Sequence, residues 1–124
     1  TIGTATPDRV KNVWEACLAE LDAKVLAGHF HNTYGMAIAN IYQSLLQGIR
    51  VFDSSIAGLG GCPYAKGASG NVSTEDLYYL LSNMGFETGI QLDALMQASR
   101  NISEVLQRNN PSNYANAYWQ KACA

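Results

Sequence analysis

Two histidines separated by one residue, His29 and His31, are the first candidates for chemistry in this chain of 124 residues. Residues i and i+2 of a strand point to the same side, so the two imidazoles would share one face. Paired imidazoles at the C-terminal end of a strand could form half of a metal site. They could equally be two hydrogen-bonded histidines of a core or cleft, and the spacing alone leaves both interpretations open.

The glycine-rich segment GLGGCPYAKGASGN at residues 58–71 is the second candidate, with five glycines around Cys62. Glycines supply positive φ angles in turns, which is the structural interpretation. Bare backbone also lets a ligand approach closely and offers N–H groups to anionic oxygens. The same N–H groups would favour a thiolate, which makes Cys62 a candidate acid/base or nucleophile.

The elements that must position these residues follow from local patterns. Thr6, Pro7 and Asp8 predict a helix start, and apolar residues at helical spacing continue to about residue 21. Cys17 lies on that apolar stripe and is expected to be a small buried hydrophobe. Further helices are expected at 38–46, 74–84 and 90–106, and buried strands at 25–31 and 49–55.

The helix expected after the glycine-rich segment has a clear N-terminal pattern. Ser73 is a good N-cap, and Asp76 follows it by three residues as a shortened capping box. Glu75 and Asp76 would then compensate the helix dipole from the first turn.

Alternating strands and helices joined by short loops indicate an α/β fold with parallel strands and right-handed crossovers. The polar, glycine-rich segments follow the C-terminal ends of both strands, the end at which (β/α) barrels and open parallel sheets bind ligands. A barrel needs eight strands, and this chain offers only three strand positions, namely a strand end in the opening TIGTATP and the two strands above.

The composition excludes several classes of protein. Apolar residues make up 48% and charged residues 15%, which favours a packed core over disorder. The net charge of −2 and the lack of a basic stripe argue against nucleic acid, and no apolar run approaches the ~20 residues of a membrane span. Three cysteines without a CxxC pair favour a reducing compartment.

The chain begins with Thr1 on a strand-end pattern, so we expect a piece of a longer protein.

Three stretches resemble the 3-hydroxy-3-methylglutaryl-CoA lyase family. The segment DSSIAGLGGCPYA at 53–65, followed by KGASGN and then TED at 74–76, is similar to the signature of that family. HFHNTYG at 29–35 resembles its second-to-last strand, and the opening TIG with Thr6-Pro7 resembles the strand before it. The resemblance implies the last three strand positions of a (β/α)8 TIM barrel at 1–106, followed by a C-terminal tail at 107–124.

The resemblance also implies roles for individual residues. His29 and His31 would bind a divalent cation, Mg²⁺ or Mn²⁺, with Asn71 adding a side-chain oxygen. His29 would also belong to the catalytic group, and Cys62 would be the general acid/base of a glycine-rich lid. Mixed nitrogen and oxygen ligands suit a hexacoordinate cation better than a tetrahedral zinc site. The implied substrate-binding residues are Gly60, Gly61, Lys66 and Ser69. The lysine would meet a phosphate of coenzyme A or simply be solvated.

The implied activity is metal-dependent cleavage of 3-hydroxy-3-methylglutaryl-CoA to acetyl-CoA and acetoacetate. A condensing synthase of the isopropylmalate or homocitrate type is the alternative, although the cysteine segment argues against it. An inactive fragment is the other alternative, since the family's Arg-Asp pair and a further aspartate would precede Thr1. The implied partners are an acyl-CoA substrate, the missing N-terminal half of the barrel and a second copy of the protein. The implied location is the bacterial cytoplasm or the mitochondrial matrix.

Two positions depart from the family pattern. Phe30 stands where cysteine is frequent, and because it faces away from the histidines its effect should be on packing. Asn32 stands where aspartate is usual, at the expected cleft edge, and could soften the ordering of a histidine.

Overall fold

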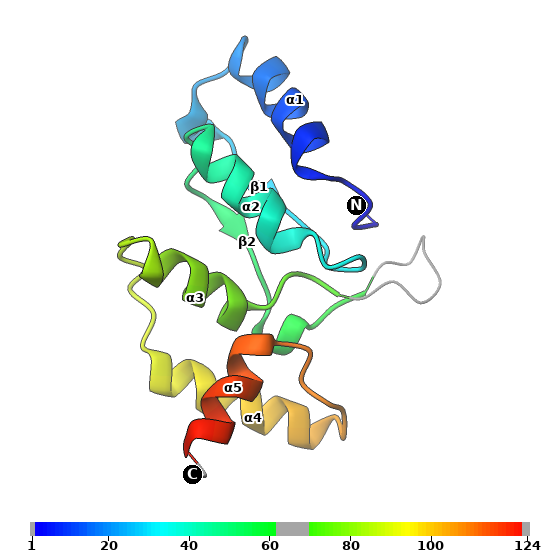
Figure 1. The fold of residues 1–124 in the computed structure, drawn as a ribbon, viewed down its shortest axis with the longest axis vertical. Helices are drawn as coiled ribbons and strands as arrows, with labels where there is room; N and C mark the ends of the chain where they lie inside the picture. The colour runs from blue at the N-terminus through cyan, green and yellow to red at the C-terminus, as the bar shows by residue number, and fades with distance from the viewer. Residues whose placement is uncertain (1, 62–69, 123–124) are drawn as a thin grey trace. The chain divides into compact units, whose positions relative to one another are not determined.

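The computed structural model of this chain describes residues 2–61 and 70–122 (Figure 1). The described helices are α1 (Pro7–Leu18), α2 (Ala37–Leu46), α3 (Thr74–Asn83), α4 (Leu92–Val105) and α5 (Asn113–Ala122), the strands are β1 (Gly28–His29) and β2 (Phe52–Asp53), and the short 3-10 turns are η1 (Ala23–Val25) and η2 (Ile56–Gly58). The chain divides into two compact units, residues 1–53 with 60–72 and residues 54–59 with 73–124.

The first unit contains the parallel pair predicted from the alternating pattern. Gly28 pairs with Phe52 and His29 with Asp53, and α2 lies between the two strands in the sequence. Both strands are much shorter than the predicted ranges of 25–31 and 49–55. The first range begins instead with η1, because the Asp22 carboxylate accepts a hydrogen bond from the backbone N–H of Lys24 at 2.9 Å and favours a turn there. Residues 2–6, predicted to end an earlier strand, have no regular structure.

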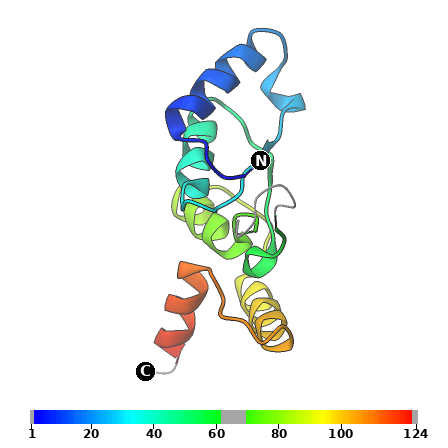
Figure 2. The ribbon, with the colours of Figure 1, turned by 90° about the vertical axis from the view of Figure 1, so that its right-hand side faces the viewer.

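The core of the first unit lies between its helices and the strand pair. Val10, Trp14 and Ile49 are buried there, and Cys17 and Phe30 are partly buried against them. Phe30 therefore faces the core as predicted, whereas Cys17 is less deeply buried than expected. In both ribbon views α1 and α2 lie side by side (Figures 1 and 2).

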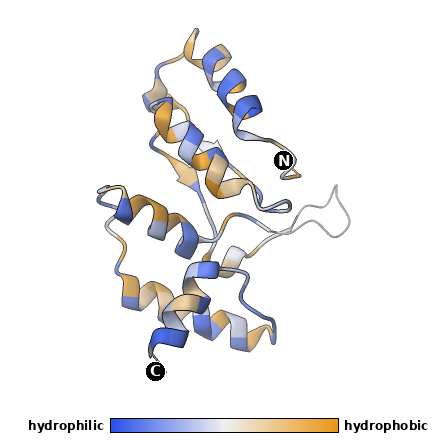
Figure 3. Ribbon diagram, in the orientation of Figure 1, coloured by the Kyte–Doolittle hydropathy of each residue, from blue (hydrophilic) through white to orange (hydrophobic). Residues whose placement is uncertain are grey.

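One buried hydrogen bond ties these two helices together. The indole Nε1 of Trp14 donates to the Ser44 hydroxyl at 2.7 Å, and this hydroxyl donates to the carbonyl of Asn40 at 2.7 Å. Hydrophobic and hydrophilic residues alternate around α1, as expected for a helix with one buried face (Figure 3).

The second unit is helical. The predicted cap of α3 is confirmed, since the Ser73 hydroxyl accepts from the backbone N–H of Asp76 at 3.2 Å. Residues 113–122, for which the sequence shows only weak periodicity, form α5. Its start is capped by the Ser112 hydroxyl, which accepts from the N–H of Ala115 at 3.0 Å. The domain boundary predicted after residue 106 stays a prediction.

Among the residues that the structure describes, no helix has both the length and the apolar character needed to cross a membrane.

Candidate metal and catalytic site

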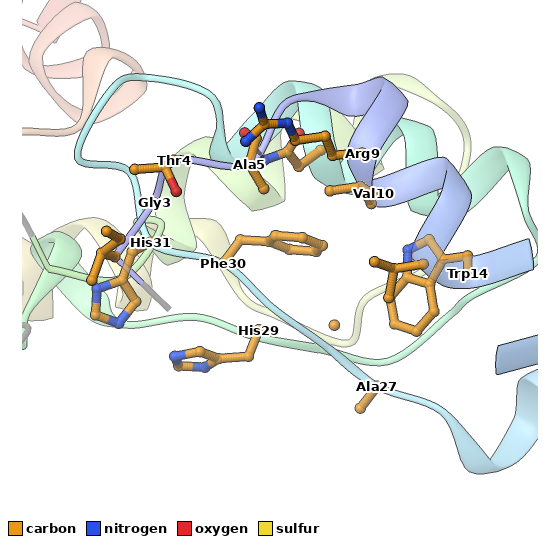
Figure 4. A pocket seen from close by; sticks show the side chains of 14 residues that line it. Gly3, Thr4, Ala5, Arg9, Val10, Trp14, Ala27, His29, Phe30 and His31 are labelled. Carbon is orange, nitrogen blue, oxygen red and sulfur yellow. Dashed lines mark hydrogen bonds between the residues drawn. The ribbon is translucent and has the colours of Figure 1, made fainter. Parts of the chain in front are cut away.

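The two histidines lie together at the C-terminal end of β1. Their ring centroids are 5.2 Å apart, with the ring planes tilted by 57°. His31 is buried, at 7% exposure, and His29 is exposed. Figure 4 shows the Phe30 ring extending away from both imidazoles, toward Val10 and Trp14. The alternation predicted for this stretch is therefore present.

Asn71 is brought to the same place by backbone pairing. His31 and Asn71 form an isolated antiparallel bridge. On either side of it, the N–H of Val72 donates to the carbonyl of Phe30 at 3.1 Å and that of Asn32 to the carbonyl of Gly70 at 3.2 Å. The three residues predicted to ligate a cation are thus neighbours within the first unit, and their role as ligands stays a prediction.

Gly60 also lies close to the side chain of Asn71. It has a φ of +107°, and a Cβ placed on it would be 2.8 Å from Nδ2 of Asn71. The backbone angle favours glycine, and a Cβ here would also displace the end of the Asn71 side chain. Gly61, by contrast, has open space around it. The bare backbone predicted to approach a ligand therefore first approaches the Asn71 side chain.

Asp53 is a member of this group that the sequence did not single out. Its Oδ2 lies 3.3 Å from Nδ1 of His29, which is its partner across the parallel pair. A carboxylate that accepts from Nδ1–H fixes the imidazole tautomer and leaves Nε2 available to a cation. The sequence did contain a signal for this contact, because in a parallel strand pair an acid at the end of one strand lies beside a histidine at the end of the other.

Asn32 has a structural role that the sequence did not indicate. Its Oδ1 accepts a hydrogen bond from the backbone N–H of Ala37, the first residue of α2, at 3.1 Å. The side chain therefore caps this helix, because the first N–H groups of a helix have no partner within it. An aspartate oxygen could accept the same hydrogen bond, so the effect predicted for this departure, on the ordering of a histidine, stays a prediction.

The remaining predicted site residues, Cys62, Lys66 and Ser69, lie outside the described residues. Their predicted roles, acid/base catalysis and substrate binding, stay predictions.

The donor set in the described part of the chain fits a hard or borderline dication only in part. Two imidazole nitrogens and one carboxamide oxygen are suitable ligands for Mn²⁺ or Mg²⁺, which fill further positions with carboxylate oxygens or water. Among the described residues there is no cluster of three or more His, Cys, Asp or Glu side chains that could hold a metal ion. A complete site would thus need oxygen ligands beyond these three side chains.

A cavity of about 610 Å³ opens beside the histidines within the first unit. His29 and His31 are among the residues that line it, together with apolar side chains that include Val10, Trp14 and Phe30 (Figure 4). The imidazoles therefore lie at the edge of a largely apolar hollow.

The parallel strand pair with helices around it is compatible with a TIM barrel or an open sheet, and the solved structures that match this chain show that it forms part of a TIM barrel. The HMGL-like family matches residues 1–102, and the chain belongs to this family.

The chain spans about two fifths or less of the length of the curated relatives it matches, which are named as lyases. The chain is 53% identical, over 98% of its length, to the 3-hydroxy-3-isohexenylglutaryl-CoA/hydroxymethylglutaryl-CoA lyase of Pseudomonas aeruginosa, of which it covers 41%. It is 54% identical over 90% of its length to the hydroxymethylglutaryl-CoA lyase of Pseudomonas mevalonii, covering 37% of that protein. The mitochondrial lyase of Bos taurus is 49% identical over 94% of the chain, which covers 36% of it.

Solved structures agree with this assignment. The hydroxymethylglutaryl-CoA lyase of Pseudomonas aeruginosa matches with a TM-score of 0.92 at 53% identity, over 98% of this chain and 40% of that structure. An HMG-CoA lyase of Acinetobacter baumannii, in complex with coenzyme A and 3-methylmalate, matches with a TM-score of 0.87 at 43% identity, over 93% of this chain and 38% of that one. The predicted fold, part of a lyase-type barrel, is confirmed.

Proposed function

We propose that this chain is part of a 3-hydroxy-3-methylglutaryl-CoA lyase, which cleaves its substrate to acetyl-CoA and acetoacetate. The observation that carries the proposal is the bridge between His31 and Asn71, which gathers two imidazoles and a carboxamide at one strand end. Identities of 49–54% to several named lyases support the same activity.

His29, His31 and Asn71 would hold the divalent cation, Mg²⁺ or Mn²⁺. When bound, the ion would polarise the C3 hydroxyl of the substrate and lower its pKa. Asp53 would hold His29 with Nε2 directed at the ion, through its contact with Nδ1. The chain spans about 40% of the length of its relatives, and we propose that the remaining ligands come from the rest of the barrel.

Cys62 would act as the general acid. Once a base of the complete protein has accepted the proton of the C3 hydroxyl, the C2–C3 bond breaks, C3 becomes the ketone carbon of acetoacetate, and C2 is left as a thioester enolate. The thiol would then deliver a proton to C2 and give acetyl-CoA. General acid/base help of this kind contributes roughly 10²–10⁴-fold in rate.

The segment around this cysteine would bind the substrate. Exposed N–H groups at Gly60 and Gly61 suit polarised oxygens, Lys66 suits a phosphate of coenzyme A, and Ser69 adds a hydroxyl. The location, bacterial cytoplasm or mitochondrial matrix, stays a prediction, because the relatives include proteins named mitochondrial and cytoplasmic.

The test is acetoacetate release from 3-hydroxy-3-methylglutaryl-CoA with Mg²⁺, in the complete protein. We expect Cys62→Ser to lose about 10²-fold or more in kcat while Mn²⁺ affinity is retained, because the thiol is assigned a proton and not the ion. Cys17→Ser, a change of a half-buried thiol on α1, is the matched control and should keep its activity.

A wild-type protein that releases no acetoacetate would contradict the proposal. Product formed only when an acyl-CoA and a keto acid are supplied together would favour a condensing synthase instead.

A further inference from the structure

Glu75 is a fully buried carboxylate that the proposed reaction does not use. It lies in the first turn of α3 with 0% exposure, and it belongs to the second unit. An isolated buried carboxylate is costly, so such a group is normally paired or fully hydrogen-bonded. Dipole compensation at a helix start, the role that the sequence indicates, does not require burial of this kind.

The partner of this carboxylate is a backbone amide upstream of the helix. The N–H of Ala57 donates to both oxygens of Glu75, at 2.9 and 3.2 Å. The hydroxyl of Ser99, on α4, donates to Oε1 as well. The side chain therefore holds η2 from within the interior of the unit.

Ala57 has an unusual backbone conformation. Its φ of 53° and ψ of 27° lie in the left-handed region, although it is not a glycine and is completely buried. A residue with a Cβ is disfavoured there by steric contact. Its carbonyl oxygen accepts a hydrogen bond from Nη2 of Arg108, so side chains hold both polar groups of this residue.

The groups behind Glu75 are themselves fixed. Nδ2 of Asn110 donates to the Ser99 hydroxyl at 2.8 Å and to the Ser103 hydroxyl at 3.1 Å. Both serines lie on α4, and Ser99 is fully buried. The carboxylate therefore has one defined position from which to hold Ala57.

Ala57 opens the segment in which the glycines begin. Gly58 and Gly60, which follow it, also have positive φ angles, of 56° and 107°. The dihedral angles of Ala57 set the direction in which the chain leaves η2. We propose that Glu75 is a positioning residue of the lyase: by holding Ala57 in its left-handed conformation, it fixes the start of the glycine-rich segment. This inference rests on the proposed function.

The test uses the complete protein with Glu75→Gln, which keeps the size of the side chain but replaces one acceptor oxygen by a donor. We expect kcat to fall roughly 10- to 100-fold, because small displacements of reacting groups have effects of this size. Mn²⁺ affinity should not change. Glu87→Gln, a change of an exposed acid beyond α3, is the matched control.

Rescue separates positioning from a general structural role. Glycine adopts the left-handed conformation without the steric cost, so Ala57→Gly in the Glu75→Gln protein should restore most of kcat. It would restore nothing if Glu75 served only to complete the interior, because glycine adds no hydrogen bond there. Unchanged kcat in the folded Glu75→Gln protein, or no rescue by Ala57→Gly, overturns the inference.

If Glu75→Gln does not fold, Arg108→Gln provides a second test of whether the conformation of Ala57 affects kcat. This side chain extends from an exposed residue and holds the other polar group of Ala57. We expect a smaller fall in kcat, again reversed by Ala57→Gly; no fall would count against the inference.

The rate at which iodoacetamide alkylates Cys62, followed by peptide mass spectrometry, gives a readout that does not need lyase activity. If the wild-type protein released no acetoacetate, the proposed function would fail. An altered alkylation rate in Glu75→Gln, reversed by Ala57→Gly, would still support the positioning of the segment, and an unaltered rate would refute it.

Discussion

The first unit contains a histidine group, His29, His31 and Asp53, and the second contains a carboxylate group, Glu75 and Ser99. The two groups differ in the solvent exposure of their polar side chains. In the first group His31 is buried, but His29 and Asp53 are largely exposed, with side chains 44% and 68% accessible and a contact of 3.3 Å between them. Glu75 and Ser99 are completely buried and surrounded by short hydrogen bonds. Ligand binding needs donor atoms that can still exchange partners, whereas a scaffold needs donor atoms whose partners are permanent. Substitutions in the first group should therefore change chemistry, and substitutions in the second should change stability or position.

The largest effect is expected from His31→Gln. Loss of this imidazole removes a proposed ligand of an ion that supplies several kcal/mol, so we expect kcat to fall roughly 10³-fold or more. Mn²⁺ binding, followed by electron paramagnetic resonance, should weaken in parallel. Tyr34→Phe, an exposed neighbour, is the control. Full Mn²⁺ affinity in His31→Gln would remove the distinction between the two groups.

Asp53→Asn should act on the same property more weakly. The amide cannot hold the Nδ1–H of His29 as a carboxylate does, and loss of such an outer partner typically costs 10- to 100-fold in metal affinity. Because this pair is exposed, we expect the Mn²⁺ affinity to fall by about 10-fold. Calorimetric titration with Mn²⁺ measures it, and the exposed Glu20→Gln should be without effect. Equal affinities of Asp53→Asn and the parent protein would show that Asp53 does not orient the imidazole.

Ser99→Ala should show the opposite pattern. It removes one hydrogen bond from Oε1 of Glu75 and one from Nδ2 of Asn110 in the interior of the unit, although Ala57 and Ser103 still bond to these groups, and we expect a loss of about 1–3 kcal/mol in the free energy of unfolding. Urea unfolding measures the loss. Mn²⁺ affinity should be unchanged, and a change in it would link the two groups directly.

Ser112→Ala should have a smaller effect on stability. Its hydroxyl accepts from the N–H of Ala115 and donates to Oδ1 of Asp76 at 2.8 Å. Loss of a helix cap of this kind costs about 1 kcal/mol. A fall in the urea midpoint checks this, and Ser112→Thr, which keeps a hydroxyl, should lose less. A midpoint unaffected by Ser112→Ala would mean that α5 does not depend on its cap.

The smallest effect concerns a tyrosine of the second unit. The hydrogen bond from the Tyr118 hydroxyl to Oδ1 of Asp93, 2.8 Å long, is the main reason why the pKa of Tyr118 is raised. A raised pKa in the folded state means that the stabilising contribution is present below the ordinary pKa of tyrosine. That contribution is lost as the pH rises through the raised value. Asp93→Asn should lower the pKa of Tyr118 in an ultraviolet titration, and an unchanged titration curve would contradict the assignment.

The helices were predictable because their signals are local. Pro7 and Asp8 follow Thr6 at the start of α1, and Ser73 caps α3, all within one turn of the helix that they begin. α5 lacks a strong apolar stripe, and part of its cap comes from Asp76, whose Oδ1 accepts from the N–H of Tyr114, 38 residues away along the chain. No local pattern contains such a partner.

The strands and the buried carboxylate were predicted less well for the same physical reason. An apolar run such as 25–31 shows where a strand can form, but its length is decided by pairing with a distant segment, here only two residues long. Glu75 was expected only to favour a helix start, because its partners Ala57 and Ser99 lie 18 and 24 residues away. The closeness of His29 and His31 followed from strand periodicity alone. The proximity of Asn71 was expected only from the family resemblance.

The placement of the two tryptophans in different units has a practical consequence for fluorescence spectroscopy. The chain contains two tryptophans, and each unit holds one: Trp14 is buried in the first, and Trp119 lies beneath the guanidinium of Arg100 in the second. Replacing either indole by phenylalanine would leave a single fluorophore that reports one unit alone. The emission maximum of each single-tryptophan protein would then show whether the two halves of the chain melt together or in succession.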